Sequence, residues 1–295
     1  MQKAKLALKT SSPSNTIVRL SDRITIGGPD LLIVGGPCSV ESQAQMEAVA
    51  SRLVLAPVQA LRGGVYKPRT SPYDFQGLGL DGLKILQAVR DRSGLPMITE
   101  VMAISQIQDI VTYADVLQVG SRNMQNFDLL KALGKIEKPV LLKRGLAATI
   151  EEFVMAAEYI LSHGNPNVIL CERGIRSFDP YTRNVLDLGA VVALKQITHL
   201  PVLVDPSHAA GKRELVADLA RAAIACGADG VMVECHPEPE QSVSDARQAL
   251  SLDEMVNLAH SLGAIATAVG RTLPQPLIDP IINLGAGSVP QLSLA

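Results

Sequence analysis

Eight short apolar runs, rich in β-branched residues, constrain the fold of this chain more than any other feature. They are LLIVGG (31–36), VQALRGG (58–64), PMITEV (96–101), VLQVGS (116–121), PVLLKRG (139–145), NVILCERG (167–174), PVLVDPSH (201–208) and GVMVECHP (230–237). Segments with helical spacing, such as IEEFVMAAEYILSHG, lie between them. Strands that are apolar on both faces and alternate with helices indicate a parallel sheet.

The number of these units favours a closed barrel over an open sheet. Eight strand–helix units in roughly 240 residues fit a (β/α)8 barrel. A doubly wound open sheet usually has fewer strands, and it would need a GxGxxG fingerprint after its first strand, where this chain has GGPCSV. Capping boxes predict four helix starts, at Ser42 with Gln45, Ser105 with Gln108, Thr149 with Glu152, and Ser251 with Glu254. We therefore predict an α/β fold of the (β/α)8 TIM barrel type.

Two short flanks remain outside the predicted barrel, which spans 31–263. Residues 1–30 form an N-terminal extension, in which TIVRLSDRITIGG (16–28) predicts a β-hairpin that plugs the barrel floor. Residues 264–295 are low in charge and are interpreted as a C-terminal tail. Neither flank is long enough for a sizeable regulatory module, so we expect none.

Composition narrows the classes of partner. The chain has 295 residues with a net charge of −2, which does not favour nucleic acid, and no window approaches the ~18 apolar residues of a membrane span. The N-terminus lacks a secretory signal, although its basic, hydroxyl-rich sequence leaves a transit peptide open. Four cysteines without a CxxC pair are typical of reduced thiols. We expect a cytoplasmic protein.

Polar or reactive side chains follow every one of the eight runs, at the barrel face where catalytic groups stand. Each has an ordinary structural alternative, such as a buried apolar cysteine or a surface arginine. Eightfold recurrence at the same end favours a functional site. The residues are Cys38, Arg62, Lys67, Glu100, Arg122, Asn123, Lys143, Arg144, Glu172, Arg173, Asp205, His208, Glu234 and His236.

Cations form the first group among these residues. Converging cations repel one another unless an anion fills the site, and arginine and lysine bind phosphate and carboxylate groups. Their number suggests two phosphorylated substrates. The alternative for each is an ion pair with a nearby acid, and for Arg144 the two readings are equally weighted. The group comprises Arg62, Lys67, Arg69, Arg122, Lys143, Arg144 and Arg173.

A candidate metal set forms the second group. Cys38, His208 and Glu234 follow the first, seventh and eighth runs, and Asp245 in the next loop completes four ligands. One thiolate, one imidazole and two carboxylates suit a divalent transition ion. His236 is a rival ligand. Structural roles are expected for the other histidines, which are His163, His199 and His260.

Several long motifs agree with one known family in order and spacing. They are GPCSVES, LRGGVYKPRTSPYDFQGLG, QVGSRNMQNFDLL, PVLLKRG, ILCERGIRSFD, LVDPSHAAGKR and VECHPEPEQSVSDARQAL. Over residues 30–260 the chain resembles 3-deoxy-D-arabino-heptulosonate-7-phosphate (DAHP) synthases of the type I-beta branch. The resemblance implies a transferase that condenses phosphoenolpyruvate with D-erythrose 4-phosphate and water, giving DAHP and phosphate, at the entrance to the shikimate pathway.

The same resemblance assigns roles to particular residues. It implies a divalent ion of the Mn, Fe, Co or Zn class on Cys38, His208, Glu234 and Asp245, and a homo-oligomer, dimer or tetramer. Lys67 and His208 become candidates for proton transfer, and Cys38 is expected to be essential to catalysis as a ligand. Phosphoenolpyruvate would be held by Arg62, Lys67, Arg122, Lys143 and Arg173, and the sugar phosphate by Lys67, Pro68, Arg69, Thr70 and Asn123.

Two other functions compete with this reading. The related 3-deoxy-D-manno-octulosonate-8-phosphate synthases use arabinose 5-phosphate, but that branch typically has KANR where this chain has KPRT. A non-catalytic phosphosugar-binding barrel would be expected to have lost ligands or cations, and all are present.

Overall fold

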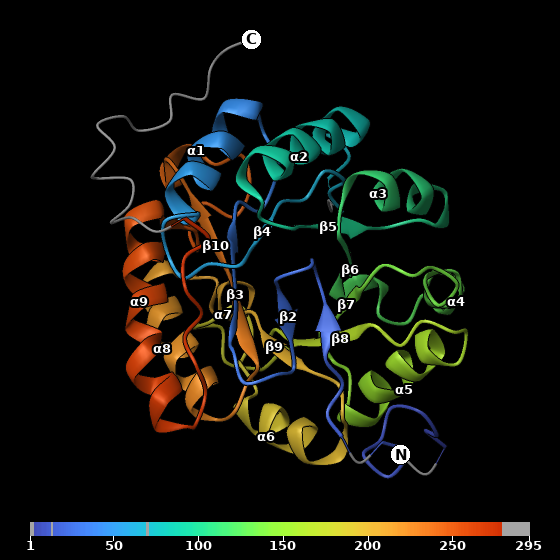
Figure 1. Cartoon of the computed structure of the whole chain (residues 1–295). Helices are drawn as coiled ribbons and strands as arrows, with labels where there is room; N and C mark the ends of the chain where they lie inside the picture. The colour runs from blue at the N-terminus through green and yellow to red at the C-terminus, as the bar shows by residue number, and fades with distance from the viewer. Residues whose placement is uncertain (1–2, 13, 69–70, 279–295) are drawn as a thin grey trace.

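A closed parallel barrel forms the centre of the molecule in a computed structural model that describes residues 3–12, 14–68 and 71–278 (Figure 1). Its strands are β3 (Leu32–Gly36), β4 (Ala60–Arg62), β5 (Met97–Val101), β6 (Val116–Val119), β7 (Val140–Lys143), β8 (Val168–Glu172), β9 (Val202–Val204) and β10 (Gly230–His236). Neighbours pair in chain order, and β10 pairs with both β9 and β3, which closes the ring. All eight predicted strands and the (β/α)8 architecture are confirmed.

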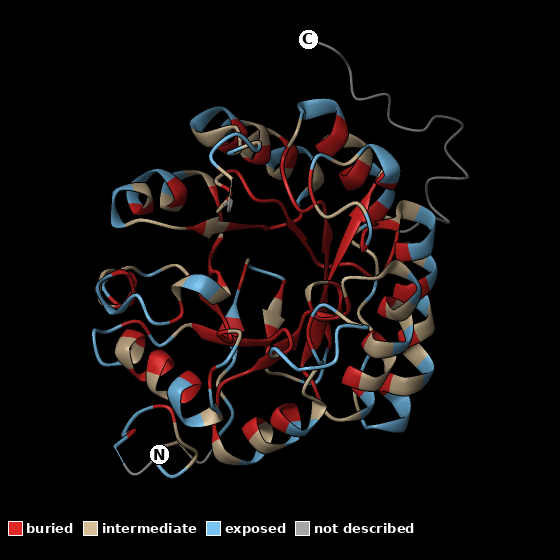
Figure 2. Cartoon of the chain, turned by 180° about the vertical axis from the view of Figure 1, so that it is seen from behind, coloured by how far each residue is buried: buried red, intermediate tan, exposed pale blue. Residues whose placement is uncertain are grey.

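Helices surround the barrel and turn their buried faces inward (Figure 2). They are α1 (Gln43–Leu53), α2 (Gly79–Ser93), α3 (Ile107–Tyr113), α4 (Phe127–Leu133), α5 (Ile150–Leu161), α6 (Leu188–Ile197), α7 (Pro206–Ala210), α8 (Arg213–Ala225) and α9 (Leu252–Ala268). The connections also contain three short 3-10 turns, η1 (Ile104–Gln106), η2 (Ser121–Asn123) and η3 (Pro239–Gln241). A short strand, β11 (Leu250–Ser251), pairs with β10. No helix of the described residues is long and apolar enough to cross a membrane.

The strands are buried on both faces because their side chains alternate between two apolar layers. Ile33 of β3 belongs to the large layer between the strands and the helices, whereas Leu32 and Val34 belong to the smaller layer inside the barrel. On β7, Leu141 points inward and Leu142 outward in the same way. Continuous apolar runs therefore mark strands with no solvent-facing side.

Of the four predicted capping boxes, two form in full. Full boxes form at Thr149 and Ser251, as predicted. Ser42 caps α1, but the Gln45 side chain accepts from the Glu41 N–H instead of completing the box. The box at Ser105 is wrong, because the turn η1 precedes α3 and the Gln106 side chain accepts the N–H groups before that turn.

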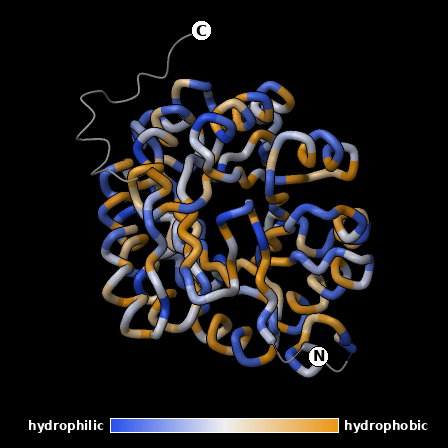
Figure 3. Tube along the Cα trace, in the orientation of Figure 1, coloured by the Kyte–Doolittle hydropathy of each residue, from blue (hydrophilic) through white to orange (hydrophobic). Residues whose placement is uncertain are grey.

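The expected hairpin is present and fills one end of the barrel. Strands β1 (Val18–Arg19) and β2 (Thr25–Ile26) pair antiparallel, and Figure 3 shows a hydrophilic loop joining them. Val18 and Ile26 pack in the inner apolar layer together with Leu32, the first residue of β3, and Met232 of β10. The division into segments 1–30, 31–263 and 264–295 stays a prediction, and α9 runs past its last boundary to Ala268.

Residues that precede the hairpin are held against the barrel by main-chain groups. The N–H groups of Lys5, Leu6 and Ala7 donate to the buried carboxylate of Glu158 on α5, at 2.8 to 3.0 Å. His199 lies 2.6 Å from the Leu6 carbonyl oxygen through its Nε2 atom, which fits the structural role expected for it.

Candidate active site

A cavity of about 360 Å³ opens at the carboxyl ends of the barrel strands. Most of the side chains predicted to act there line it. They are Cys38, Arg62, Lys67, Pro68, Arg122, Lys143, Arg173, His208 and Asp245, with Glu100, Gln118, Gly120, Ser121, Leu146, Arg176, Arg183 and Asn184. The lining is dominated by cations, so the cavity suits an anionic ligand.

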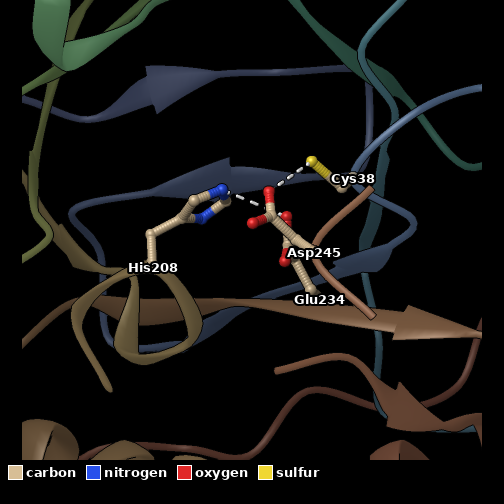
Figure 4. Close-up of side chains that lie close together, drawn as sticks. All are labelled: Cys38, His208, Glu234 and Asp245. Atoms are coloured by element: carbon tan, nitrogen blue, oxygen red, sulfur yellow. Dashed lines mark hydrogen bonds and ion pairs between the residues drawn. The ribbon is translucent and has the colours of Figure 1, made fainter. Parts of the chain in front are cut away.

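Four candidate metal ligands converge beside this cavity (Figure 4). Cys38 follows β3, His208 lies on α7, Glu234 lies in the second half of β10, and Asp245 comes from the loop before β11. Each offers one ligand atom, and these atoms lie within 4.8 Å of one another. His208 Nε2 is 3.1 Å from Glu234 Oε1, and Cys38 Sγ is 3.1 Å from Asp245 Oδ2.

The imidazole of His208 is oriented by the cap of its own helix. Asp205 caps α7, accepting the His208 N–H at 2.9 Å and contacting His208 Nδ1 at 2.7 Å. A carboxylate only accepts, so Nδ1 carries a proton, and this contact fixes the ring with Nε2 directed at the cluster. Histidine ligands of metals are commonly held by a carboxylate in this way.

His236 is placed elsewhere. Its Nδ1 accepts the Glu238 N–H at 3.0 Å, and its Nε2 lies 3.4 Å from Glu41 Oε2. The cluster of four described above does not include it.

These residues fit a divalent metal ion. A sulfur, an imidazole nitrogen and two carboxylates form a donor set that such ions bind. Burial, reinforced by the charge of Glu234, raises the pKa of the Cys38 thiol to about 11. A cation placed between Cys38, Glu234 and Asp245 would restore the thiolate and relieve the repulsion between the acidic groups.

Several cavity cations contact this cluster or its support. Arg62 Nη1 donates to Glu234 Oε1 at 2.7 Å, and Lys67 Nζ donates to Cys38 Sγ at 2.9 Å. Lys143 pairs with Asp205, the cap that holds His208. The cations and the candidate ligands therefore form one charged network.

Two arginines that line the cavity keep buried donors unpaired. Arg62 Nε and Arg173 Nη1 are buried and have no hydrogen-bond partner among the described residues. Burial lowers the pKa of Arg173, although the charge of Asp205 opposes it. A buried donor without a partner costs free energy, and a bound anion would supply the missing acceptor.

Other predicted residues lie outside this arrangement. Arg144 is buried and pairs with Glu172 Oε2 at 2.8 Å and Asp187 Oδ2 at 3.0 Å, so the ion-pair alternative is the one found. Asn123 lies on η2 and accepts from Asn126 Nδ2 at 3.4 Å, and it does not line the cavity. Arg69 and Thr70 lie outside the described residues.

Among the lining residues that the sequence analysis did not single out, three come from one segment. Arg176, Arg183 and Asn184 come from the polar segment 173–187 between β8 and α6. This segment shows neither strand nor helix periodicity, so only its length and its arginines, in RGIRSFDPYTRN, signal a role at the barrel mouth.

Comparison with known proteins identifies the family. Residues 15–270 match the model of the DAHP synthetase I family. The chain is 48% identical over 266 residues to the phospho-2-dehydro-3-deoxyheptonate aldolase of Thermotoga maritima, covering 90% of this chain and 78% of that protein. A 2-dehydro-3-deoxyphosphooctonate aldolase of Syntrophotalea carbinolica is 32% identical over 265 residues, with 83% and 95% covered.

Solved structures agree with this result. The crystal structure of the Thermotoga maritima DAHP synthase superposes with a TM-score of 0.88 at 46% identity, covering 92% of this chain and 78% of that one. A truncated form of the Thermotoga maritima 3-deoxy-D-arabino-heptulosonate 7-phosphate synthase gives a TM-score of 0.85 at 43% identity, covering 91% and 98%. The chain therefore belongs to the DAHP synthetase I family.

Proposed function

We propose that this chain condenses phosphoenolpyruvate with D-erythrose 4-phosphate and water, giving DAHP and inorganic phosphate as the first step of the shikimate pathway. In this reaction C3 of phosphoenolpyruvate bonds to the aldehyde carbon, water adds at C2, and the bond from C2 to the phosphate oxygen breaks. One observation carries the proposal beyond family membership. Unpaired buried donors of Arg62 and Arg173 and a four-ligand cluster share one cavity.

The cofactor is a divalent ion of the Mn, Fe, Co or Zn class, held by Cys38, His208, Glu234 and Asp245. When bound, such an ion supplies a Lewis acid for the aldehyde oxygen. Cys38 is essential as a ligand, and the donor set found around it supports this assignment.

Cations of the cavity bind and orient phosphoenolpyruvate. Arg62 Nε and Arg173 Nη1 donate to its anionic oxygens, and Lys143 and Arg122 add charge at the cavity wall. Fixed donors of this kind stabilise the charge of the departing phosphate without reorganisation.

Proton transfer falls to Lys67. Both ring nitrogens of His208 are engaged, Nδ1 with Asp205 and Nε2 with the cluster, so this residue acts as a ligand. Lys67 Nζ donates to Cys38 Sγ at 2.9 Å and lines the cavity, which places a hydrogen-bond donor beside the candidate metal ligands. Pro68 also lines the cavity, and we assign the sugar phosphate to its KPRT stretch and to Asn123, which does not itself line the cavity but follows the lining residue Arg122.

A substrate panel tests the proposal against its nearest rival. The 32% identical octulosonate relative makes arabinose 5-phosphate the substrate to compare. We expect phosphate release from phosphoenolpyruvate with erythrose 4-phosphate, and loss of that release after chelation until metal is restored. Preference for arabinose 5-phosphate would reassign the substrate, and absence of turnover with either sugar would favour a binding protein.

Assembly and location belong to the proposal as well. We expect a cytoplasmic homo-oligomer, either a dimer or a tetramer. Tyr73 and Phe178 are 96% and 99% exposed, which is unusual for aromatic side chains and is consistent with an interface. Light scattering after gel filtration checks the oligomer, and a monomeric mass at micromolar concentration would contradict it.

A further inference from the structure

The dipeptide Arg183–Asn184 connects two of the candidate ligands that the chain supplies from separate elements. Arg183 Nη2 donates to Asp245 Oδ1 at 2.8 Å, while the other oxygen, Oδ2, faces Cys38 Sγ at 3.1 Å. Asn184 Nδ2 donates to the carbonyl oxygen of His208 at 3.1 Å. Adjacent residues thus contact two ligand residues, one through its carboxylate and one through its backbone.

This dipeptide is fixed to the helix that carries His208. The N–H groups of Arg183 and Asn184 donate to the carbonyl oxygens of Ala210 and Ala209, at 3.0 and 2.8 Å. Gly211, with φ of 66°, ends α7 against the same segment, and a Cβ atom there would lie 2.7 Å from the Cβ atom of Arg183. The guanidinium therefore projects toward Asp245 from a rigid base.

Asp245 needs such external support. Its φ of 58° makes it the one non-glycine residue with positive φ in the part of the chain that the structure describes. It lies in the connection between η3 and β11, outside any strand or helix of the barrel. A strained residue in a loop keeps its orientation only when its surroundings fix it.

We propose that Arg183 and Asn184 are positioning residues for the metal centre, with Arg183 fixing the carboxylate of Asp245 so that one oxygen remains directed at the ion. This inference rests on the proposed metal site. It predicts that Arg183 governs metal affinity in the absence of any substrate. A role in binding substrate phosphate alone would leave that affinity unchanged.

The test is a Co²⁺ titration of the metal-free full chain, followed by absorption and by competition with a chromophoric chelator. Arg183→Gln is expected to raise the Kd about tenfold or more, which is typical of outer partners of metal ligands. Arg176→Gln is the matched control, because it removes the same charge from the same cavity wall and segment. Among the described residues, Arg176 forms one hydrogen bond, from its backbone N–H to the Leu146 carbonyl oxygen, so the Kd of Arg176→Gln is expected to stay within about twofold of the wild type.

A Kd of Arg183→Gln within about twofold of the wild type would overturn the inference, as would an equal loss in Arg176→Gln. If Arg183→Gln does not fold, Arg183→Lys carries the same test. Its point charge cannot replace the planar fork, so a rise of at least about fivefold is expected, and an unchanged Kd again refutes the role. Failure of the wild type to bind Co²⁺ at all would instead refute the metal site itself, and the inference with it.

Discussion

The same substitution is expected to have opposite effects at two arginines that follow neighbouring strands. Arg173 lines the cavity with an unpaired buried donor, whereas Arg144 is buried in ion pairs with Glu172 and Asp187. Replacing each by methionine keeps an unbranched, flexible side chain and removes the charge. The effects on ligand binding and on the free energy of unfolding should separate.

For Arg173→Met the binding of phosphoenolpyruvate should weaken. A hydrogen bond between charged groups contributes about 1.5–3 kcal/mol, which corresponds to roughly a 10- to 100-fold rise in Kd. The ligand-free protein should become more stable. Burial lowers the pKa of Arg173, so the folded state disfavours the charged form that the residue nevertheless keeps. Removing the unpaired donor is expected to gain about 1 kcal/mol, or about 2 °C in Tm.

Arg144→Met should instead destabilise the protein and leave ligand binding unchanged. Breaking a buried pair leaves the carboxylates of Glu172 and Asp187 uncompensated and is expected to cost about 3–5 kcal/mol of unfolding free energy. Phosphoenolpyruvate affinity should stay close to that of the wild type, because Arg144 does not line the cavity.

Calorimetric titration with phosphoenolpyruvate and thermal unfolding with and without it measure both quantities. Unchanged affinity in Arg173→Met would refute the assignment of its unpaired donor to the substrate. A ligand-free Arg173→Met as destabilised as Arg144→Met would refute the argument from burial.

Three further predictions concern the ion and one helix. Cys38→Ser should nearly abolish both activity and metal binding with an unchanged circular dichroism spectrum, whereas Cys235→Ala, which removes a buried thiol of the outer apolar layer, should keep both; activity in metal-free Cys38→Ser would contradict the ligand role. Metal binding between pH 7 and 9 should release a proton from the Cys38 thiol, whose pKa of about 11 keeps it protonated in the metal-free protein, so affinity rises by up to about tenfold per pH unit. Calorimetry in buffers of different ionisation enthalpy detects this release, and a buffer-independent enthalpy would exclude it. Ser251→Ala removes the cap of α9 and should lower the unfolding free energy by about 1 kcal/mol in urea titrations, whereas an exposed Ser51→Ala control on α1 should change it little.

The eight strands could be predicted because each is a continuous apolar run, a pattern that depends on burial alone. The same alternation also separates the cavity side chains from the structural ones. Lys143 lies two residues from the inward Leu141, and Arg173 two residues from the inward Cys171, so both point into the barrel. Arg144 is one residue further along than Lys143, so its side chain points to the outer face of the strand, where it pairs with Glu172.

Features that depend on tertiary contacts could not be predicted from the sequence. The box at Ser105 fails because a 3-10 turn moves the start of the helix, which no single residue signals. Arg183 was missed because it reaches Asp245 across 62 positions, from a segment without periodicity. Candidate ligands could be assigned because each lies near the carboxyl end of a strand or in the loop after it, whereas the residues that hold those ligands follow no such rule.

The attachment of the N-terminal segment has a consequence for how the chain can diverge. Glu158 is held by the main-chain N–H groups of three successive residues, not by their side chains. Every amino acid except proline carries that group, and the side chains of Lys5 and Leu6 are exposed, so drift at positions 5 and 6 is tolerated as long as Glu158 persists, whereas Ala7 is fully buried and leaves no room for a larger residue. Homologues are therefore expected to vary freely at positions 5 and 6, to keep a small residue at position 7, and to share one acidic position on the helix beneath.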